Sequence, residues 1–126
     1  MLPLSMDNIP AMPTPRLVDT TGLEAALQQF ADARHWNRFH APKNLAMALT
    51  GEVGELVEIF QWLTEDESRR VMDDPATAQA VRDEVADVMM YLVRLSSILG
   101  IDLDAAVGAK LTANARKYPA PPPTSP

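Results

Sequence analysis

The sequence predicts an all-α domain, a four-helix-bundle-like fold with one short extra helix. Apolar residues recur at three- and four-residue steps, and helix-capping residues stand at the ends of those stretches. No segment alternates apolar and polar residues as a β-strand does. At 126 residues the chain suits one domain with a buried core. We place that domain at residues 20–119.

Prolines mark the two ends of this body. Of the 11 prolines, four precede residue 16 and five follow residue 118. Proline fixes φ and lacks an N–H donor, so residues 1–19 and 120–126 are predicted to be irregular or disordered. The first segment lacks the features of a signal peptide, and no apolar run is long enough to cross a bilayer. We therefore expect a cytoplasmic protein.

The first two helices are predicted from their apolar spacing. One is expected over residues 23–34 after a threonine cap, followed by a connection at residues 35–40 that is rich in aromatic and hydrogen-bonding groups. Pro42 is well suited to the first position of a helix. The spacing of apolar residues beyond it predicts a second helix over residues 42–63.

Capping signals delimit the remaining helices. Thr64 and Glu67 form a capping-box pattern, which predicts a short helix over residues 65–72. An Asp-Pro pair then begins a helix over residues 75–99, and a glycine follows it as the C-terminal cap. The last helix is expected over residues 103–117.

The second half of the helix predicted over residues 75–99 bears on how the protein assembles. From residue 88 to residue 99 the only charged residue is Arg94, so this helix is apolar on nearly every side. Helices of that kind are covered on more than one face, and one small domain covers only part of it. We therefore predict a homo-oligomer, either a homodimer or a homotetramer.

Composition narrows the class of ligand. The net charge of −6 argues against binding to nucleic-acid polymers or membrane surfaces, because proteins that bind them use a basic face. A phosphate-bearing ligand stays open if bound metal reverses the local sign of the charge. The chain has no cysteine, which excludes disulfides and thiolate metal sites and fits a reducing compartment.

Two acidic steps are the strongest candidates for chemistry. Glu52 and Glu55 stand three residues apart on one predicted helix, as Glu84 and Asp87 do on another, so each pair shares a helix face. None has a lysine or arginine four residues later. Solvated surface carboxylates are the plain alternative. Four such carboxylates among apolar residues favour a site for Mg²⁺ or Mn²⁺, while di-iron bundles would need a histidine in each step.

Aromatic and basic residues stand near these steps. Trp62 and Tyr91 each lie seven residues beyond an acidic residue, which predicts an aromatic ring along the same helix face. In the connection, Trp36 and His40 are either a core lid and a solvated imidazole, or a ring and a hydrogen-bonding group for a flat ligand. On the last helix, residues such as Lys110 and Asn114 either complement the helix dipole or hold an anion.

The sequence around the acidic steps resembles that of a known family. The chain carries Glu-x-x-Glu at residues 52–55, a spacer of 28 residues, and Glu-x-x-Asp at residues 84–87. Around them stand WNRFHAPKNL at residues 36–45 and FQW at residues 60–62. These stretches resemble the MazG-like all-α nucleoside-triphosphate pyrophosphatases, and most closely the dCTP pyrophosphatase branch. The resemblance extends over residues 23–119.

The resemblance implies a fold of the MazG type and a set of site residues. It implies Mg²⁺, with Mn²⁺ as a substitute, bound by four carboxylates: Glu52, Glu55, Glu84 and Asp87. It implies a nucleotide pocket lined by four rings: Trp36, His40, Trp62 and Tyr91. Lys110 and Asn114 would reach phosphate, from the same or a neighbouring subunit. One position departs from the branch, because Leu27 stands where a substrate-contacting histidine is expected. The base preference is therefore left open.

Two functions follow as hypotheses. The first is metal-dependent hydrolysis of a (deoxy)nucleoside triphosphate, dCTP or a related dNTP, to the monophosphate and pyrophosphate, in control or cleansing of the nucleotide pool. Glu55 would be the general base, with Glu58 and Asp83 as supporting carboxylates. The second is a non-catalytic helical dimer that senses a nucleotide or binds a partner through the same cleft.

Overall fold

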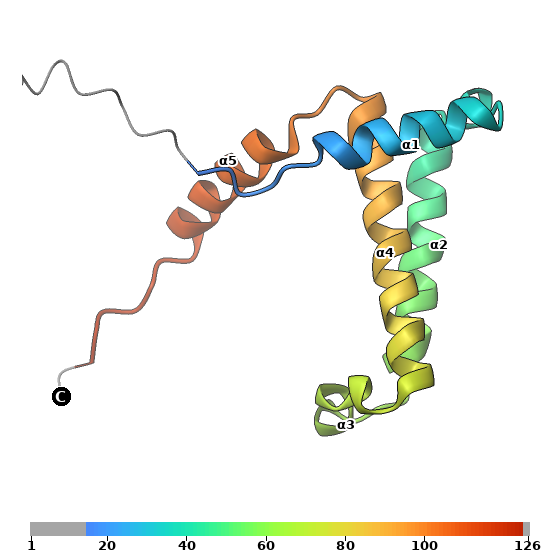
Figure 1. The fold of residues 1–126 in the computed structure, drawn as a ribbon. Helices are drawn as coiled ribbons and strands as arrows, with labels where there is room; N and C mark the ends of the chain where they lie inside the picture. Colours follow the sequence, from blue (N-terminus) through green and yellow to red (C-terminus); the bar gives the residue numbers. More distant parts are fainter. Residues whose placement is uncertain (1–14, 125–126) are drawn as a thin grey trace, which may run out of the picture.

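The computed structural model describes residues 15–124, and all regular structure in that range is helical. Of the irregular segments expected at residues 1–19 and 120–126, residues 1–14 and 125–126 lie outside the described residues, and the described parts contain no helix. Figure 1 shows the arrangement. In chain order the elements are α1 (Thr21–Ala33), η2 (Asn37–Phe39), α2 (Pro42–Phe60), α3 (Glu65–Arg69), η3 (Val71–Asp73), α4 (Pro75–Ile98) and α5 (Leu103–Lys117). The all-α class is confirmed.

The bounds of four predicted helices differ from expectation, α1 by two residues at its start and one at its end, and α4 by one residue at its end. The larger differences are at α2 and α3. α2 ends at Phe60, three residues early, because the Leu63 N–H donates to the Phe60 carbonyl in a tight turn. The chain then becomes extended at Thr64, whose hydroxyl accepts from the Glu67 N–H at 3.1 Å and completes the predicted capping box. The short helix expected over residues 65–72 is divided at Arg70, whose backbone leaves the helical region.

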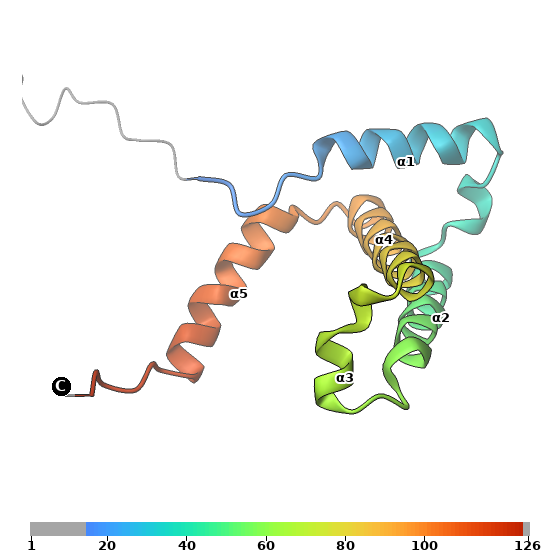
Figure 2. The same cartoon turned by 60° about the horizontal axis from the view of Figure 1, so that its bottom comes forward.

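α2 and α4 form the central pair of the fold. They run side by side in opposite directions, α1 lies across one end of the pair, and α3 closes the other end (Figures 1 and 2). The buried apolar residues come from these three long helices: Ala31, Leu45, Ala78 and Val93. Both acidic steps therefore stand on the two helices that pack most closely.

α5 lies apart from the central pair in both views. Gly100, at φ 69°, allows the chain to turn away after α4. The segment before α1 is hydrogen-bonded to the first turn of α5. The Leu17 and Val18 N–H groups donate to Asp104 Oδ1 at 2.7 and 3.2 Å. The four main helices thus do not close into a bundle within one chain. None of the helices in the described residues is both long and apolar enough to span a membrane.

Candidate functional site

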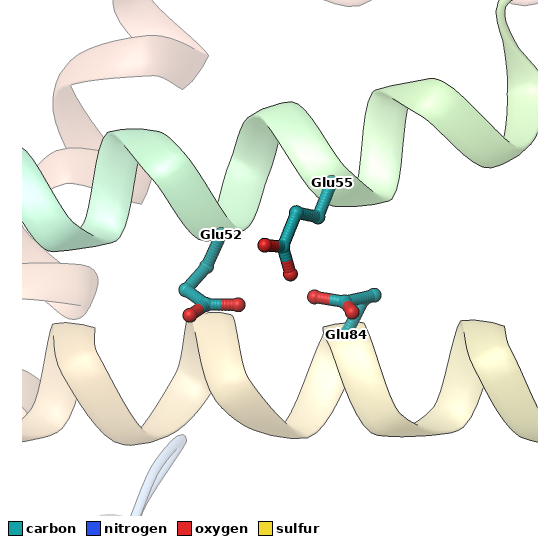
Figure 3. A group of neighbouring side chains, drawn as sticks. All are labelled: Glu52, Glu55 and Glu84. Carbon is teal, nitrogen blue, oxygen red and sulfur yellow. The ribbon is translucent and has the colours of Figure 1, made fainter.

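Three carboxylates meet between α2 and α4. Glu52 and Glu55 point from α2 toward α4, and Glu84 points back from α4, as Figure 3 shows. One carboxylate oxygen from each residue lies within 4.8 Å of the others. We call these three residues the acidic cluster. It confirms that the two steps face each other across the helix pair.

The acidic cluster lacks a basic partner. Within residues 15–124 the ion pairs are Arg16–Asp19 and Arg69–Asp66, both on the surface. Glu52 Oε2 and Glu84 Oε2 are buried and accept no hydrogen bond. A buried carboxylate oxygen without a partner is costly. A donor set of carboxylate oxygens in this state fits a hard divalent cation.

Proximity of the three carboxylates changes their proton affinity. Burial raises the pKa of Glu52, and the charges of Glu55 and Asp87 raise it further. Burial, a proton shared with Glu52 and the charge of Glu55 raise the pKa of Glu84 to about 7. Proton binding and cation binding at the acidic cluster are therefore expected to compete.

Asp87 lies beside the acidic cluster and also borders a cavity. Its charge acts on Glu52, while its side chain lines a cavity of about 390 Å³ between α1, the connection and α4. The apolar part of the lining comes mainly from α1 and includes Leu27, the position that departs from the dCTP branch. Asp87 thus joins the carboxylate end of the site to the cavity end.

The side chains of Trp36, His40 and Tyr91, which we call the aromatic wall, lie between this cavity and a second one. Trp36, His40, Leu45 and Tyr91 line both the first cavity and a neighbouring cavity of about 360 Å³. The rings of Trp36 and His40 meet edge to face with centroids 6.4 Å apart. Three of the four predicted pocket rings are thereby brought together, at the end of the site that Asp87 borders.

Sequence reasoning missed Arg94 as a site residue. It is 3% exposed and lines the first cavity together with Asp87 and Tyr91. Its guanidinium donates to Gln28, Asn37 and His40. The signal was present, because a single charge in an otherwise apolar helix segment needs buried partners. Those partners stand 54 to 66 residues away in the chain, so spacing did not reveal them.

Comparison with known proteins decides the family. A model described as the MazG-like family matches residues 48–124, more than half of the chain. The chain belongs to the MazG-like family. Human dCTP pyrophosphatase 1 is 44% identical over 108 residues, which are 86% of this chain and 62% of that protein. The rat protein of the same name is 42% identical over 107 residues, 85% of this chain and 61% of that protein.

A solved structure supports the same assignment. This MazG-like chain superposes on a pyrophosphatase from Archaeoglobus fulgidus with a TM-score of 0.74 and 37% identity, over 86% of this chain and 100% of that chain. The resemblance to the dCTP pyrophosphatase branch is thus confirmed. The chain spans about three fifths of the length of the curated mammalian relatives, at 61–62% of each.

Three residues that the MazG-like resemblance implies do not lie at this site within one chain. Trp62 is 87% exposed, because α2 ends at Phe60 and the helical azimuth that aligned Trp62 with Glu55 no longer applies. Lys110 and Asn114 stand on α5, which lies away from the acidic cluster (Figures 1 and 2). A role for these residues at the site requires a second chain or a different position of α5.

Proposed function

We propose that the protein hydrolyses a (deoxy)nucleoside triphosphate, dCTP or a related dNTP, to the nucleoside monophosphate and pyrophosphate. The observation that carries the proposal is the junction at Asp87, where three carboxylates, two of them with a buried oxygen that accepts no hydrogen bond, meet an aromatic cavity. One end suits a metal-bound triphosphate and the other suits a planar base. The human and rat relatives are named dCTP pyrophosphatase 1, which supports this substrate class.

The carboxylates would hold Mg²⁺, with Mn²⁺ as a substitute. We assign Glu52, Glu55, Glu84 and Asp87 to this role. When bound, the cation offsets phosphate charge and orients a water for attack at the α-phosphorus. Glu55 is the most exposed member of the acidic cluster, so it is the carboxylate best placed to accept the proton of that water. The bond between the α-phosphorus and the bridging oxygen then breaks and releases pyrophosphate.

The aromatic wall would bind the base. Trp36 and Tyr91 offer rings for stacking, and His40 offers a hydrogen-bonding group beside them. Leu27 makes the α1 side of the cavity apolar where the dCTP branch carries a histidine. Base discrimination in this chain therefore depends on the polar groups of the connection and α4.

We further propose that the working form is a homodimer or homotetramer in which Trp62, Lys110 and Asn114 act on a neighbouring subunit's site. Apolar residues at helical spacing are exposed on α2 at Val53 and Val57, and on α4 at Val85, Met89 and Leu92. A small domain with such unpartnered stripes favours self-association. Lys110 would then complement phosphate charge.

The activity is tested with the purified chain, Mg²⁺ and a panel of dNTPs, measuring pyrophosphate. We expect turnover that EDTA abolishes and that falls by about a thousandfold or more in Asp87→Asn. Glu65→Gln, an exposed carboxylate of α3, should retain wild-type turnover. If the folded wild-type chain binds dNTPs and releases no pyrophosphate, the non-catalytic sensing module replaces the enzyme.

A further inference from the structure

Arg94 is a buried cation held entirely by uncharged groups. Its Nη1 donates to Gln28 Oε1 at 2.7 Å, its Nη2 to Asn37 Oδ1 at 2.9 Å, and its Nε to His40 Nδ1 at 3.0 Å. Within residues 15–124 no carboxylate forms an ion pair with this guanidinium. Buried charges normally need a compensating partner. The arrangement must therefore be stabilised by the orientation of these three neutral groups.

Asp32 fixes that orientation from the surface. Its Oδ1 accepts from Asn37 Nδ2 at 2.7 Å and from Gln28 Nε2 at 2.8 Å. Because both amides donate their nitrogens to Asp32, both turn their oxygens toward Arg94. Each hydrogen bond is thus donated away from the guanidinium: Arg94 donates to the two amides, and the two amides donate to Asp32.

Arg94 is also the donor in its contact with the imidazole of His40. An arginine Nε carries a hydrogen at every accessible pH, so His40 Nδ1 must be the acceptor and cannot carry a proton. In the neutral ring the proton then resides on Nε2. Burial lowers the pKa of His40, and the charge of Arg94 lowers it further, which agrees with a neutral ring. His40, Tyr91 and Arg94 line the same cavity.

We propose that Arg94 is a positioning residue that holds His40 as the neutral Nε2–H tautomer, so that the cavity presents a hydrogen-bond donor to the base. The consequence for the base rests on the proposed function. A fixed donor accepts a base with a lone pair at the facing edge, as on N3 of cytosine, and rejects an N–H at that place, as on N3 of thymine. Leu27 cannot supply this discrimination, since its side chain has no polar atom.

The tautomer is tested without substrate by ¹⁵N NMR of the full chain. The chain has two histidines, and His35, which is exposed and has no ring hydrogen bond within residues 15–124, provides the internal reference. We expect His40 to show protonated Nε2 and unprotonated Nδ1 at pH 7.5. Finding Nδ1–H, or an averaged ring like that of His35, would overturn the proposal irrespective of enzymatic activity.

Variants separate positioning from folding. Arg94→Gln should release His40 into a mixture of tautomers, and Arg94→Lys should do the same because an ammonium cannot reproduce the three-point contact. The matched control is Arg34→Gln, whose guanidinium lies over the Phe30 ring at 3.4 Å and does not touch His40. A wild-type tautomer in a folded Arg94→Gln protein would contradict the assignment. If that variant does not fold, the wild-type spectrum alone still decides the tautomer.

Base preference is tested by binding of the α,β-imido analogues of dCTP and dTTP, which need no turnover. We expect the wild-type chain to prefer the cytosine analogue, and this preference to shrink about tenfold in Arg94→Gln and to persist in Arg34→Gln. An unchanged preference in a variant with an altered tautomer would show that His40 does not read the base. Failure of the proposed function would instead leave the tautomer intact while no pyrophosphate is released.

Discussion

At the scale of one residue, the position of Glu84 in the acidic cluster lowers the stability of the metal-free protein. Its carboxyl is packed against Glu52 and near Glu55, and its pKa rises from the ordinary 4.5 to about 7. The folded chain therefore binds a proton that the unfolded chain has already released over that pH interval. Stability of the metal-free protein must then fall as pH rises through this window.

The first prediction follows from that sign. In EDTA, Glu84→Gln should be as stable as the wild type near pH 4, and its advantage should grow as pH rises to about 7 and then level off. Thermal unfolding across pH 4–8 measures this. Saturating Mg²⁺ should reverse the order, because a cation that binds the folded chain stabilises the wild type and has fewer ligands in the variant.

The control for this experiment is Glu65→Gln, an exposed carboxylate at the start of α3. Because Glu65 lies outside the acidic cluster, this substitution should leave the stabilisation by Mg²⁺ at its wild-type size. A Glu84→Gln protein whose stability tracks the wild type at every pH would remove the case for a strained acidic cluster.

Residue identities at the site could be predicted to different degrees from the sequence. The four carboxylates were found because a three-residue step on a helix is a local pattern. Arg94 was noticed as an isolated charge, yet its contacts with Gln28, Asn37 and His40 depend on how α1 crosses α4. Such long-range packing leaves no periodic signal in the chain.

At the scale of elements, caps predicted the starts of α3 and α4, whereas α1 begins at Thr21, two residues early, and the threonine before it makes no side-chain cap hydrogen bond. α4 begins at Pro75 after Asp74, whose carboxylate accepts from the Thr77 N–H at 2.9 Å as expected. The end of α2 was wrong by three residues because apolar spacing continues through Leu63 while the backbone turns to meet the capping box. This error placed Trp62 on a helix face that does not extend that far.

The second prediction concerns the segment that holds α5. Leu17 and Val18 donate their N–H groups to Asp104, and Leu17 Cδ1 lies 3.8 Å from the position that a Cβ atom at Gly108 would occupy. In Asp104→Ala the amide hydrogens of residues 17 and 18 should exchange roughly five- to tenfold faster, since each loses its acceptor. Hydrogen-exchange NMR of the full chain measures this.

Two comparisons keep that test specific. The Ala105 N–H donates to Asp102 at 3.1 Å, so its exchange should stay close to the wild-type rate. Asp104→Asn retains an acceptor oxygen and should have a smaller effect than Asp104→Ala. Equal exchange rates at residues 17 and 18 in all three proteins would mean that this contact does not hold α5.

At the scale of the whole molecule, the helices leave apolar surface uncovered. Met89, Leu92, Ile98 and Leu99 of the largely apolar α4 segment are exposed in the single chain, as are Val107 and Leu111 of α5. The sequence predicted a covered helix, and one chain covers only part of it. The proposed homo-oligomer would cover this surface with a second chain, and periodicity within one chain does not describe that second surface.

The third prediction tests assembly and the reach of α5 together. We expect sedimentation to give a dimer or tetramer, and Lys110→Ala to lose activity without loss of fold, because its ammonium would complement phosphate charge on a neighbour's site. Glu55→Gln should be inactive for a separate reason, the loss of a carboxylate from the acidic cluster. Each protein alone therefore lacks a complete site.

Mixing the two inactive proteins decides whether the site is shared. In a mixed dimer, the site built on the Lys110→Ala chain has all its carboxylates and receives an intact Lys110 from the Glu55→Gln chain, whereas the other site has both defects. After unfolding and refolding an equal mixture, half of the dimers are mixed and each has one complete site, so about a quarter of wild-type activity should return. If Lys110 acts within its own chain, every mixed dimer stays inactive. Recovery of activity would then explain why α5 lies away from the carboxylates of its own chain.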